Sequence, residues 1–324
     1  MARTAFIDRI GGPEVIQWHD VDLPPPGPGE VLMRHHAVGV NYIDTYHRGG
    51  LYPVDLPAGL GSEAAGVIEA VGDGVADFAV GDRVGTFGPA RGAYATARIV
   101  PAAQLIRLPD DIDDRTAAAV LLKGCTVECL VERCAKVQRG QTVVVWAAGG
   151  GVGHLLTGWL AAIGAQVIAI AGTAEKTAGA LAAGAAHAID HRREDVAARV
   201  RDITGGDGVP VVFDGVGAAT WQASLAMTAR RGLIVSYGNA GGAVTGVNLG
   251  ALAAKGSLFV TRPTLFDYYA TPDERTTGVE RLFAMIRQGA VRPEIGHTFA
   301  LEDAADVHRA LEAGKTRGSI VLIP

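Results

Sequence analysis

A β-branched strand that runs directly into a glycine-rich turn constrains this chain more than any other feature. Residues 143–153 read VVVWAAGGGVG, and an apolar helical segment, Leu155 to Ile163, follows at once. Glycines let main chain approach a pyrophosphate closely at a helix N-terminus, where unpaired N–H groups and the helix dipole favour an anion. The spacing is A-x-x-G-x-x-G, from Ala147 through Gly150 to Gly153. This context predicts a dinucleotide site, and a purely structural turn is the alternative.

Strands and helices alternate regularly after this turn. We expect strands at 142–147, 166–171, 187–190, 209–214 and 232–237, and helices at 152–163, 174–184, 194–204 and 219–229. Apolar strands separated by helical segments are typical of a parallel sheet covered on both faces. Residues 1–122 instead combine short alternating strands with dense Pro and Gly turns, which indicates a β-rich domain. A last strand near 319–323 is expected to return to that first domain.

Length and charge limit the classes of protein that this chain can represent. Its 324 residues favour two domains, and a net charge of −5 without a basic stripe disfavours nucleic acid or an anionic membrane as partner. Because no apolar run approaches a membrane span and the N-terminus lacks a signal-peptide core, we expect a cytoplasmic protein. Cys125, Cys129 and Cys134 have no C-x-x-C spacing, so we interpret them as small buried hydrophobes, with a redox or metal role as the alternative.

The end of the second strand of the alternating region indicates which dinucleotide binds. Residues 170–176 read IAGTAEK, so no carboxylate stands at the position that accepts the ribose 2′-OH of NAD. Lys176 follows one turn later, and the third strand ends in Asp190-His191-Arg192-Arg193. We therefore favour NADPH, although Glu175 argues mildly against it and the cations are alternatively solvated charges at helix ends.

Long blocks of the chain carry a family resemblance from end to end. They include NYIDTYHRGGLYP at 41–53, GLGSEAAG at 59–66, AAGGGVG at 147–153 and RRGLIVSYGNAGGAVTGVNLG at 230–250. The chain resembles the zinc-free quinone oxidoreductases of the medium-chain dehydrogenase/reductase superfamily, the zeta-crystallin-like family, and in particular its bacterial NADPH:quinone oxidoreductases. The resemblance implies an α/β fold with a GroES-like catalytic domain over 1–122 and 265–324 and a Rossmann doubly wound domain over 123–264.

Two positions indicate that no metal takes part. The zinc-dependent relatives carry a cysteine where Asn41 stands and a histidine where Ser62 stands, and neither residue here replaces a thiolate or an imidazole at zinc. Without a Lewis acid we expect hydride transfer from NADPH to an acceptor that is already electrophilic, a quinone. An enone or 2-alkenal reductase is the alternative enzyme, and a non-catalytic NADPH-binding, crystallin-like protein is the alternative outside enzymes.

The resemblance also assigns site residues. Tyr46, Tyr52 and Arg262 would face the acceptor, with Arg262 orienting a quinone oxygen or forming a loop salt bridge, and Asn41 is a positioning amide rather than a proton donor. Water or a tyrosine would supply the proton. The expected cofactor contacts are Tyr42, Ile43, Asp44, Thr45, Tyr46, Thr126, Gly150, Gly151, Val152, Gly172, Thr173, Ala174, Glu175, Lys176, His191, Arg193, Val216, Tyr237, Gly238, Asn239, Ala240, Pro263, Thr264, Leu265 and Lys315.

Three positions depart from the family pattern. His191 and Cys129 stand where the family has tyrosines, and Gly314 replaces an arginine for which Lys315 is the candidate substitute. The apolar strand at 257–261 would expose unpaired backbone groups, so we expect a homodimer through this edge, as the resemblance also implies.

Overall fold

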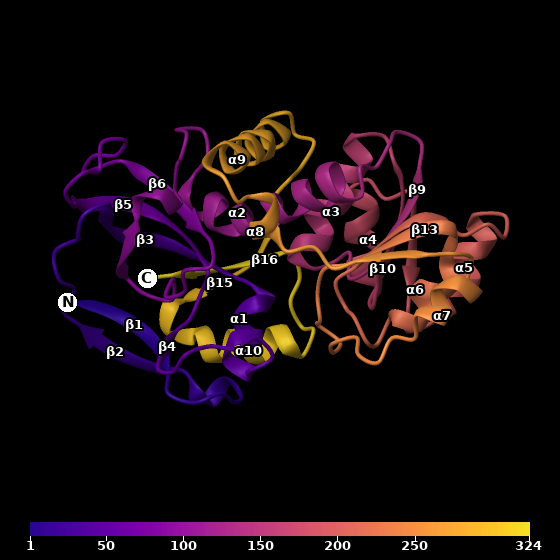
Figure 1. The fold of residues 1–324 in the computed structure, drawn as a ribbon, viewed down its shortest axis with the longest axis horizontal. Helices are drawn as coiled ribbons and strands as arrows, with labels where there is room; N and C mark the ends of the chain where they lie inside the picture. The colour runs from indigo at the N-terminus through magenta and orange to yellow at the C-terminus, as the bar shows by residue number, and fades with distance from the viewer. The chain divides into compact units, whose positions relative to one another are not determined.

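A computed structural model describes residues 1–324 (Figure 1). The chain divides into two compact units, one formed by Met1–Lys123 with Ile295–Pro324 and the other by Gly124–Glu294. Residues 265–294 belong to the second unit, whereas the sequence-based limits gave them to the first. They stay there because the Tyr269 hydroxyl donates to Glu128 at 2.8 Å and Arg133 donates to the carbonyl of Tyr268 at 2.9 Å.

The first unit is built from two sheets. Its small sheet has the order β2-β1-β4, and its large, mainly antiparallel sheet has the order β15-β16-β3-β5-β6-β8, with β7 paired to β3. The C-terminal strand β16 pairs with β3, so the chain end returns to this unit. The elements are β1 (Ala2–Ile7), β2 (Gln17–Val21), β3 (Glu30–Val40), α1 (Tyr42–Gly49), β4 (Ala58–Gly59), β5 (Glu63–Val71), β6 (Arg83–Phe87), β7 (Ala97–Pro101), β8 (Leu105–Arg107), α2 (Asp114–Glu128), β15 (Ile295–Ala300), α10 (Ala304–Glu312) and β16 (Ser319–Ile323), with short 3-10 turns at Pro13–Val15, Ala102–Gln104 and Leu301–Asp303.

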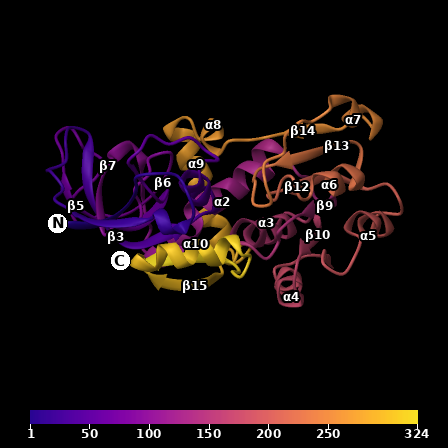
Figure 2. The same ribbon diagram turned by 90° about the horizontal axis from the view of Figure 1, so that it is seen from below.

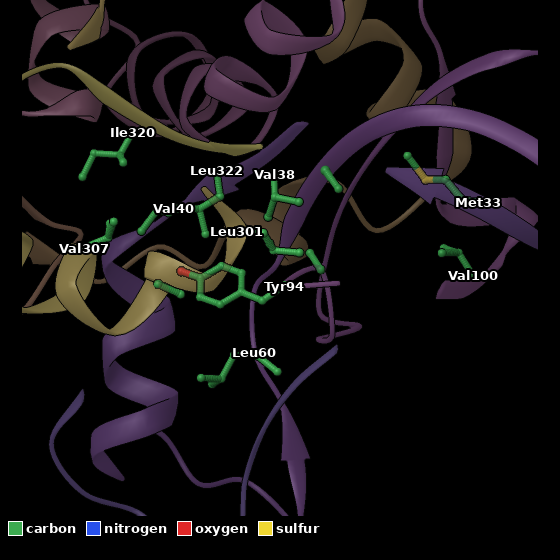
Figure 3. Close-up of a cluster of buried hydrophobic side chains, with 14 of the residues drawn as sticks. Met33, Val38, Val40, Leu60, Tyr94, Val100, Leu301, Val307, Ile320 and Leu322 are labelled. Carbon is green, nitrogen blue, oxygen red and sulfur yellow. The ribbon is translucent and has the colours of Figure 1, made fainter. Parts of the chain in front are cut away.

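Alternation along the strands builds the core of this unit. Met33 and Val38 of β3, Leu322 of β16 and Val307 of α10 are all buried in one cluster. Tyr94 lies within this cluster, fully buried, and its hydroxyl oxygen is directed toward the side on which Val307 lies (Figure 3). A polar oxygen inside an apolar cluster needs hydrogen-bond partners, and here Asp44 and His308 provide them.

The second unit is a doubly wound α/β domain, as expected. All strand pairs of its sheet are parallel, and the order is β11-β10-β9-β12-β13-β14, the 3-2-1-4-5-6 order of dinucleotide-binding folds. Figure 2 shows the part of this order from β10 to β14. Helices α3 and α4 contact each other, as do α5 and α6, which is the arrangement expected when right-handed crossovers cover both faces of the sheet. The elements are a π-helical turn η3 (Cys129–Cys134), β9 (Thr142–Val145), α3 (Gly151–Ala162), β10 (Gln166–Ala171), α4 (Ala174–Ala182), β11 (His187–Asp190), α5 (Val196–Ile203), β12 (Val209–Asp214), α6 (Trp221–Met227), β13 (Thr228–Ser236), α7 (Leu249–Ala254), β14 (Phe259–Thr261), α8 (Leu265–Tyr268) and α9 (Pro272–Arg287).

The expected elements of this sheet are present, with two shifts in their ends. Strand β13 begins at Thr228 rather than near 232, because an irregularity between Val209 and Val211 lets β12 pair with this earlier segment. Strand β14 covers only Phe259–Thr261. None of the helices combines the length and the apolar character that crossing a bilayer requires.

Candidate functional site

The glycine-rich turn lies at the switch point of the parallel sheet. Strand β9 pairs with β10 on one side and with β12 on the other, so the strand order reverses beside it. Ala147 takes a left-handed conformation (φ 53°), Gly150 caps α3, and Gly151 begins the helix. A Cβ atom on Gly153 would collide with the carbonyl of Ala147, so only glycine allows α3 to approach β9 this closely. The arrangement leaves main-chain N–H groups at a helix N-terminus, where the positive end of the helix dipole favours an anion.

A cationic cluster forms at the neighbouring strand ends. A Cβ atom on Gly172, after β10, would lie 2.6 Å from His191 Nε2 and 3.2 Å from Arg192 Nε. Lys176, in the first turn of α4, packs over Gly149, whose Cβ position lies 2.7 Å from Lys176 Cβ. Burial, and then the charge of Arg192, lowers the pKa of Lys176 below its ordinary value. We call Lys176, His191 and Arg192 the cationic cluster.

Arg192 and Arg193 have different surroundings. The sequence-based assignment named Arg193, but its guanidinium is 79% exposed and lies 3.6 Å from the Asp190 carboxylate. Arg192 is the arginine that lies beside Gly172. Thr173, expected to contact the cofactor, caps α4 by accepting a hydrogen bond from the Lys176 N–H at 3.2 Å.

The sequence analysis missed a buried cluster of hydrogen-bonded side chains at the end of β12, Asp214, Ser224 and Trp146, which we call the polar floor. Asp214, at the end of β12, accepts the N–H groups of Val216 and Gly217 at 2.9 and 3.0 Å. Its other oxygen accepts the Ser224 hydroxyl, which in turn accepts the indole N–H of Trp146 at 2.9 Å. A carboxylate directly after an apolar strand, in VVFDGVG, was the available signal. This floor fixes the turn that carries Val216, one of the expected cofactor contacts.

Arg262 is hydrogen-bonded to the end of β13 and to the loop that follows it. Its Nη1 donates to the carbonyls of Ser236 and Gly238 at 3.0 and 2.8 Å. When the Asn239 amide is oriented so that its nitrogen donates to the Gly238 carbonyl, its oxygen accepts a hydrogen bond from Arg262 Nη2 at 2.9 Å. Arg262 therefore ties β14 to the loop after β13, where the expected contacts Tyr237, Gly238, Asn239 and Ala240 lie.

Helix α1 of the first unit carries an aromatic ladder. The ring centroids of Tyr42 and Tyr46 are 5.4 Å apart, and those of Tyr46 and Tyr52 are 5.2 Å apart. His47 completes the group at 6.0 Å from Tyr52. We call Tyr42, Tyr46 and Tyr52 the tyrosine ladder. Burial raises the pKa of Tyr42 above its ordinary value, so the phenol stays protonated.

Asn41 and Ser62 make hydrogen bonds to buried carboxylates. Asn41 Nδ2 donates to Glu63 at 2.9 Å, and Ser62 Oγ donates to Asp44 at 3.1 Å. Glu63 also accepts from the ammonium of Lys123 at 3.2 Å. No group of three or more His, Cys, Asp or Glu side chains is placed to hold a metal ion. Asn41, the N-cap residue of α1, thus has its side-chain amide bonded to a buried carboxylate.

The remaining assigned residues fall into two sets, one in each unit. Cys129 is buried, and burial raises its pKa to about 12, which makes it a poor nucleophile. Lys315 is exposed after α10. The first unit carries Asn41, Tyr42, Ile43, Asp44, Thr45, Tyr46, Tyr52 and Lys315, and the second carries Thr126, Gly150, Gly151, Val152, Gly172, Thr173, Ala174, Glu175, Lys176, His191, Arg193, Val216, Tyr237, Gly238, Asn239, Ala240, Arg262, Pro263, Thr264 and Leu265.

Known proteins are similar to this chain in sequence and in fold over its whole length. Residues 27–110 match the alcohol dehydrogenase GroES-like domain, and residues 183–322 match the zinc-binding dehydrogenase family. A quinone oxidoreductase of Pseudomonas aeruginosa is 47% identical over 325 residues, covering 100% of both chains. A 2-haloacrylate reductase of a Burkholderia species is 41% identical over 331 residues, covering 100% of this chain and 99% of the relative. The structure of Escherichia coli quinone oxidoreductase complexed with NADPH superimposes with a TM-score of 0.97 at 43% identity, covering 100% of both chains.

Proposed function

The chain belongs to the quinone oxidoreductase family of the medium-chain dehydrogenases/reductases, and from that membership we propose that it reduces quinones with NADPH. It is an oxidoreductase that acts on a small molecule. The observation that carries the choice of cofactor is the cationic cluster beside Gly172, because three nitrogen-bearing side chains meet where an NAD enzyme has a carboxylate.

The residues of the second unit fit NADPH. The N-terminus of α3 supplies main-chain N–H groups for the pyrophosphate, and Lys176 and Arg192 supply charge for a 2′-phosphate. Gly172 leaves space in which a larger residue would displace His191 and Arg192. When bound, NADPH supplies the hydride that reduces the acceptor.

The residues of the first unit support the acceptor side of the reaction. The tyrosine ladder offers aromatic faces for a planar quinone, and the raised pKa of Tyr42 keeps its phenol protonated. Tyr46 and Tyr52 are our candidates for contact with the acceptor. Asn41 acts through α1 as a positioning residue, and Arg262 acts through the loop after β13. In this proposal the side chains contribute orientation, and water or a tyrosine provides the proton.

A steady-state assay tests this function. Oxidation of NADPH is followed with a quinone, a 2-alkenal and a 2-haloacrylate in turn, and the quinone is expected to give the highest kcat/KM. Removal of the Tyr52 hydroxyl in Tyr52→Phe should change kcat/KM for the acceptor and leave NADPH affinity unchanged. A higher kcat/KM with either unsaturated carbonyl compound, or no turnover with any acceptor, would contradict the proposal.

We also infer that two copies pair through β14. This strand forms the edge of the six-stranded sheet, and Phe259 and Val260 are 58% and 39% exposed. Leu249, in the preceding helix, is 75% exposed. An apolar edge strand with unpaired backbone groups pairs readily with a second copy. Light scattering at micromolar concentration should give a dimer for the wild type and a monomer for Val260→Lys. Val80→Lys, at an exposed apolar position of the first unit, is the matched control that should remain dimeric. A monomeric wild type would contradict the inference.

A further inference from the structure

Four polar side chains form a continuous hydrogen-bonded chain through the interior of the first unit. Nη1 of Arg48 lies 3.2 Å from Nδ1 of His308, and Nε2 of His308 lies 2.9 Å from the Tyr94 hydroxyl. The Tyr94 hydroxyl lies 3.1 Å from Oδ2 of Asp44. Arg48 is 4% exposed and the other three residues are fully buried. We call Arg48, His308, Tyr94 and Asp44 the Asp44 chain.

The direction of every bond in the Asp44 chain is determined by Arg48. A guanidinium only donates, so Nδ1 of His308 must accept and the single ring proton sits on Nε2. Burial, and then the charge of Arg48, lowers the pKa of His308 to about 3, which keeps the imidazole neutral. His308 Nε2–H therefore donates to the Tyr94 oxygen, and the Tyr94 hydroxyl has its own proton free to donate to Asp44. All the bonds point toward one carboxylate.

Asp44 collects two further donors at the start of α1. The backbone N–H of Asn41 donates to Oδ2 at 2.8 Å, and Ser62 donates to Oδ1 at 3.1 Å. The charged group that acts on Asp44 is Lys123 from α2, which is itself bonded to Glu63 of β5. The charge of Arg48 from α1 acts on Tyr94, the next member of the Asp44 chain. These donors and Lys123 lower the pKa of Asp44, but burial outweighs them and raises it to about 6. Protonation would weaken all three bonds, because charge-assisted hydrogen bonds are about twice as strong as neutral ones.

The Asp44 chain contacts both ends of helix α1. Asp44 is held against the Asn41 N–H at the N-terminus of the helix. Arg48, in its last turn, is tied to α10 by His308 and by two bonds to Glu312 at 2.6 and 3.1 Å. Tyr42 and Tyr46 lie between these two anchors.

We propose that the Asp44 chain is a positioning device: it fixes both ends of α1 and thereby holds the tyrosine ladder in the geometry that acceptor reduction requires. This inference rests on the proposed function for its effect on turnover. The four residues act through α1 and are positioning residues.

Tyr94→Phe is the first test, because it removes one hydroxyl group and keeps the ring in the core. Asp44 loses a donor to its ionised form, so the acid limb of kcat/KM for the quinone should move up by about one pH unit. The dissociation constant for NADPH should change less than kcat/KM, because most of the expected cofactor contacts lie in the second unit. The matched control is Tyr269→Phe, which deletes a buried hydroxyl that donates to a carboxylate, Glu128, in the second unit. Its acid limb should stay at the wild-type pH.

Two substitutions of His308 test the direction of the chain. Gln places its amide N–H near the position of Nε2 and keeps the donor to Tyr94, whereas Asn places its carbonyl near Nδ1 and keeps only the acceptor for Arg48. His308→Gln should retain the wild-type acid limb, and His308→Asn should move it upward as Tyr94→Phe does. The opposite order would overturn the assigned direction.

A purely structural role predicts a different result. Tyr94→Phe would then lower thermal stability by as much as Tyr269→Phe does and leave the acid limb in place, which would overturn the proposal. The pH dependence of thermal unfolding, compared between wild type and Tyr94→Phe, provides a readout without substrate. If no quinone is reduced, the proposed function fails. The Asp44 chain is then still supported if the pH at which thermal stability changes is higher in Tyr94→Phe than in the wild type. An unchanged pH overturns it.

Discussion

The cationic cluster of the second unit and the Asp44 chain of the first unit both consist of polar side chains, but they differ in exposure. His191 and Arg192 are exposed, and Lys176 is only partly buried. The four members of the Asp44 chain are buried and bonded to one another. Exposed polar side chains remain available for an anionic ligand, whereas the buried groups are already hydrogen-bonded to one another and hold the elements around them in place. This difference in exposure distinguishes side chains proposed to bind the cofactor from side chains proposed to hold α1 in place.

The energetic contrast follows from the same difference. An exposed ion pair contributes about 0–1 kcal/mol, because water competes for both charges. Removing one partner of a buried pair costs about 3–5 kcal/mol, because the other charge is left without compensation. Substitutions that break a buried ion pair should therefore lower the free energy of unfolding, and substitutions in the cationic cluster should lower the affinity for NADPH.

The largest effect is expected for Glu63→Gln. Glu63 is fully buried and bonded to Lys123, whose side chain is 7% exposed. The substitution leaves the ammonium buried without its counter-charge, so the free energy of unfolding should fall by about 3–5 kcal/mol. Urea denaturation at pH 7 measures it. The control is Asp306→Asn, in an exposed pair with Arg309, which should lose less than about 1 kcal/mol. Equal small losses would remove the contrast between the two regions.

The next effect concerns the pH dependence that Asp44 imposes on stability. Burial raises its folded-state pKa from 3.8 to about 6, so its contribution is complete below pH 3.8 and is lost as pH rises through 6. The free energy of unfolding of the wild type minus that of Asp44→Asn should thus fall by up to about 3 kcal/mol between pH 4 and pH 7. Urea denaturation over this range measures the difference. A difference that rises with pH would show that the carboxylate is stabilised rather than strained by its surroundings.

A smaller effect is expected for Lys176→Ala in the cationic cluster. Loss of a charge-assisted hydrogen bond to the 2′-phosphate should weaken NADPH binding by about tenfold or more and leave NADH binding nearly unchanged. Arg192→Ala should act in the same direction. Arg193→Ala is the matched control, and titration calorimetry should find its NADPH affinity close to that of the wild type. An equal loss for both cofactors in Lys176→Ala would assign the lysine to the fold.

The smallest effect is expected for Gly172→Ala. The added Cβ atom meets the end of the His191 ring at 2.6 Å, and this side chain can turn away at low cost. NADPH affinity should therefore fall by less than in Lys176→Ala, with no change in thermal stability. A larger loss than in Lys176→Ala would mean that His191, and not the lysine, dominates phosphate binding.

Local sequence patterns predicted the second unit well. Residues 143–153 and the alternation after them predicted the parallel sheet and its turn. They also predicted NADPH as the cofactor, and a quinone oxidoreductase of the same fold has been solved in complex with NADPH. These features depend on neighbours in sequence: a glycine beside a helix start, or the residues directly after a strand. Arg193 was chosen over Arg192 because periodicity does not say which of two adjacent arginines turns toward a neighbouring strand end.

The first unit shows what the sequence alone leaves open. Arg48 and His308 are 260 positions apart, and Tyr94 and His308 are 214 apart. No spacing rule connects residues at such separations, so the Asp44 chain could not be inferred. Arg262 likewise gained its role from carbonyl groups of the neighbouring strand end, 24 and 26 residues earlier.

By itself, the sequence determined the alternation of strands and helices, the glycine turn, the missing zinc ligands at positions 41 and 62 and the family, since each is written in short or contiguous segments. Only the tertiary structure decided which polar groups are buried together, where residues 265–294 pack and which way each hydrogen bond of the Asp44 chain runs. The physical reason is that burial and hydrogen-bond direction depend on all the groups that fold around an atom, and most of these come from distant parts of the chain.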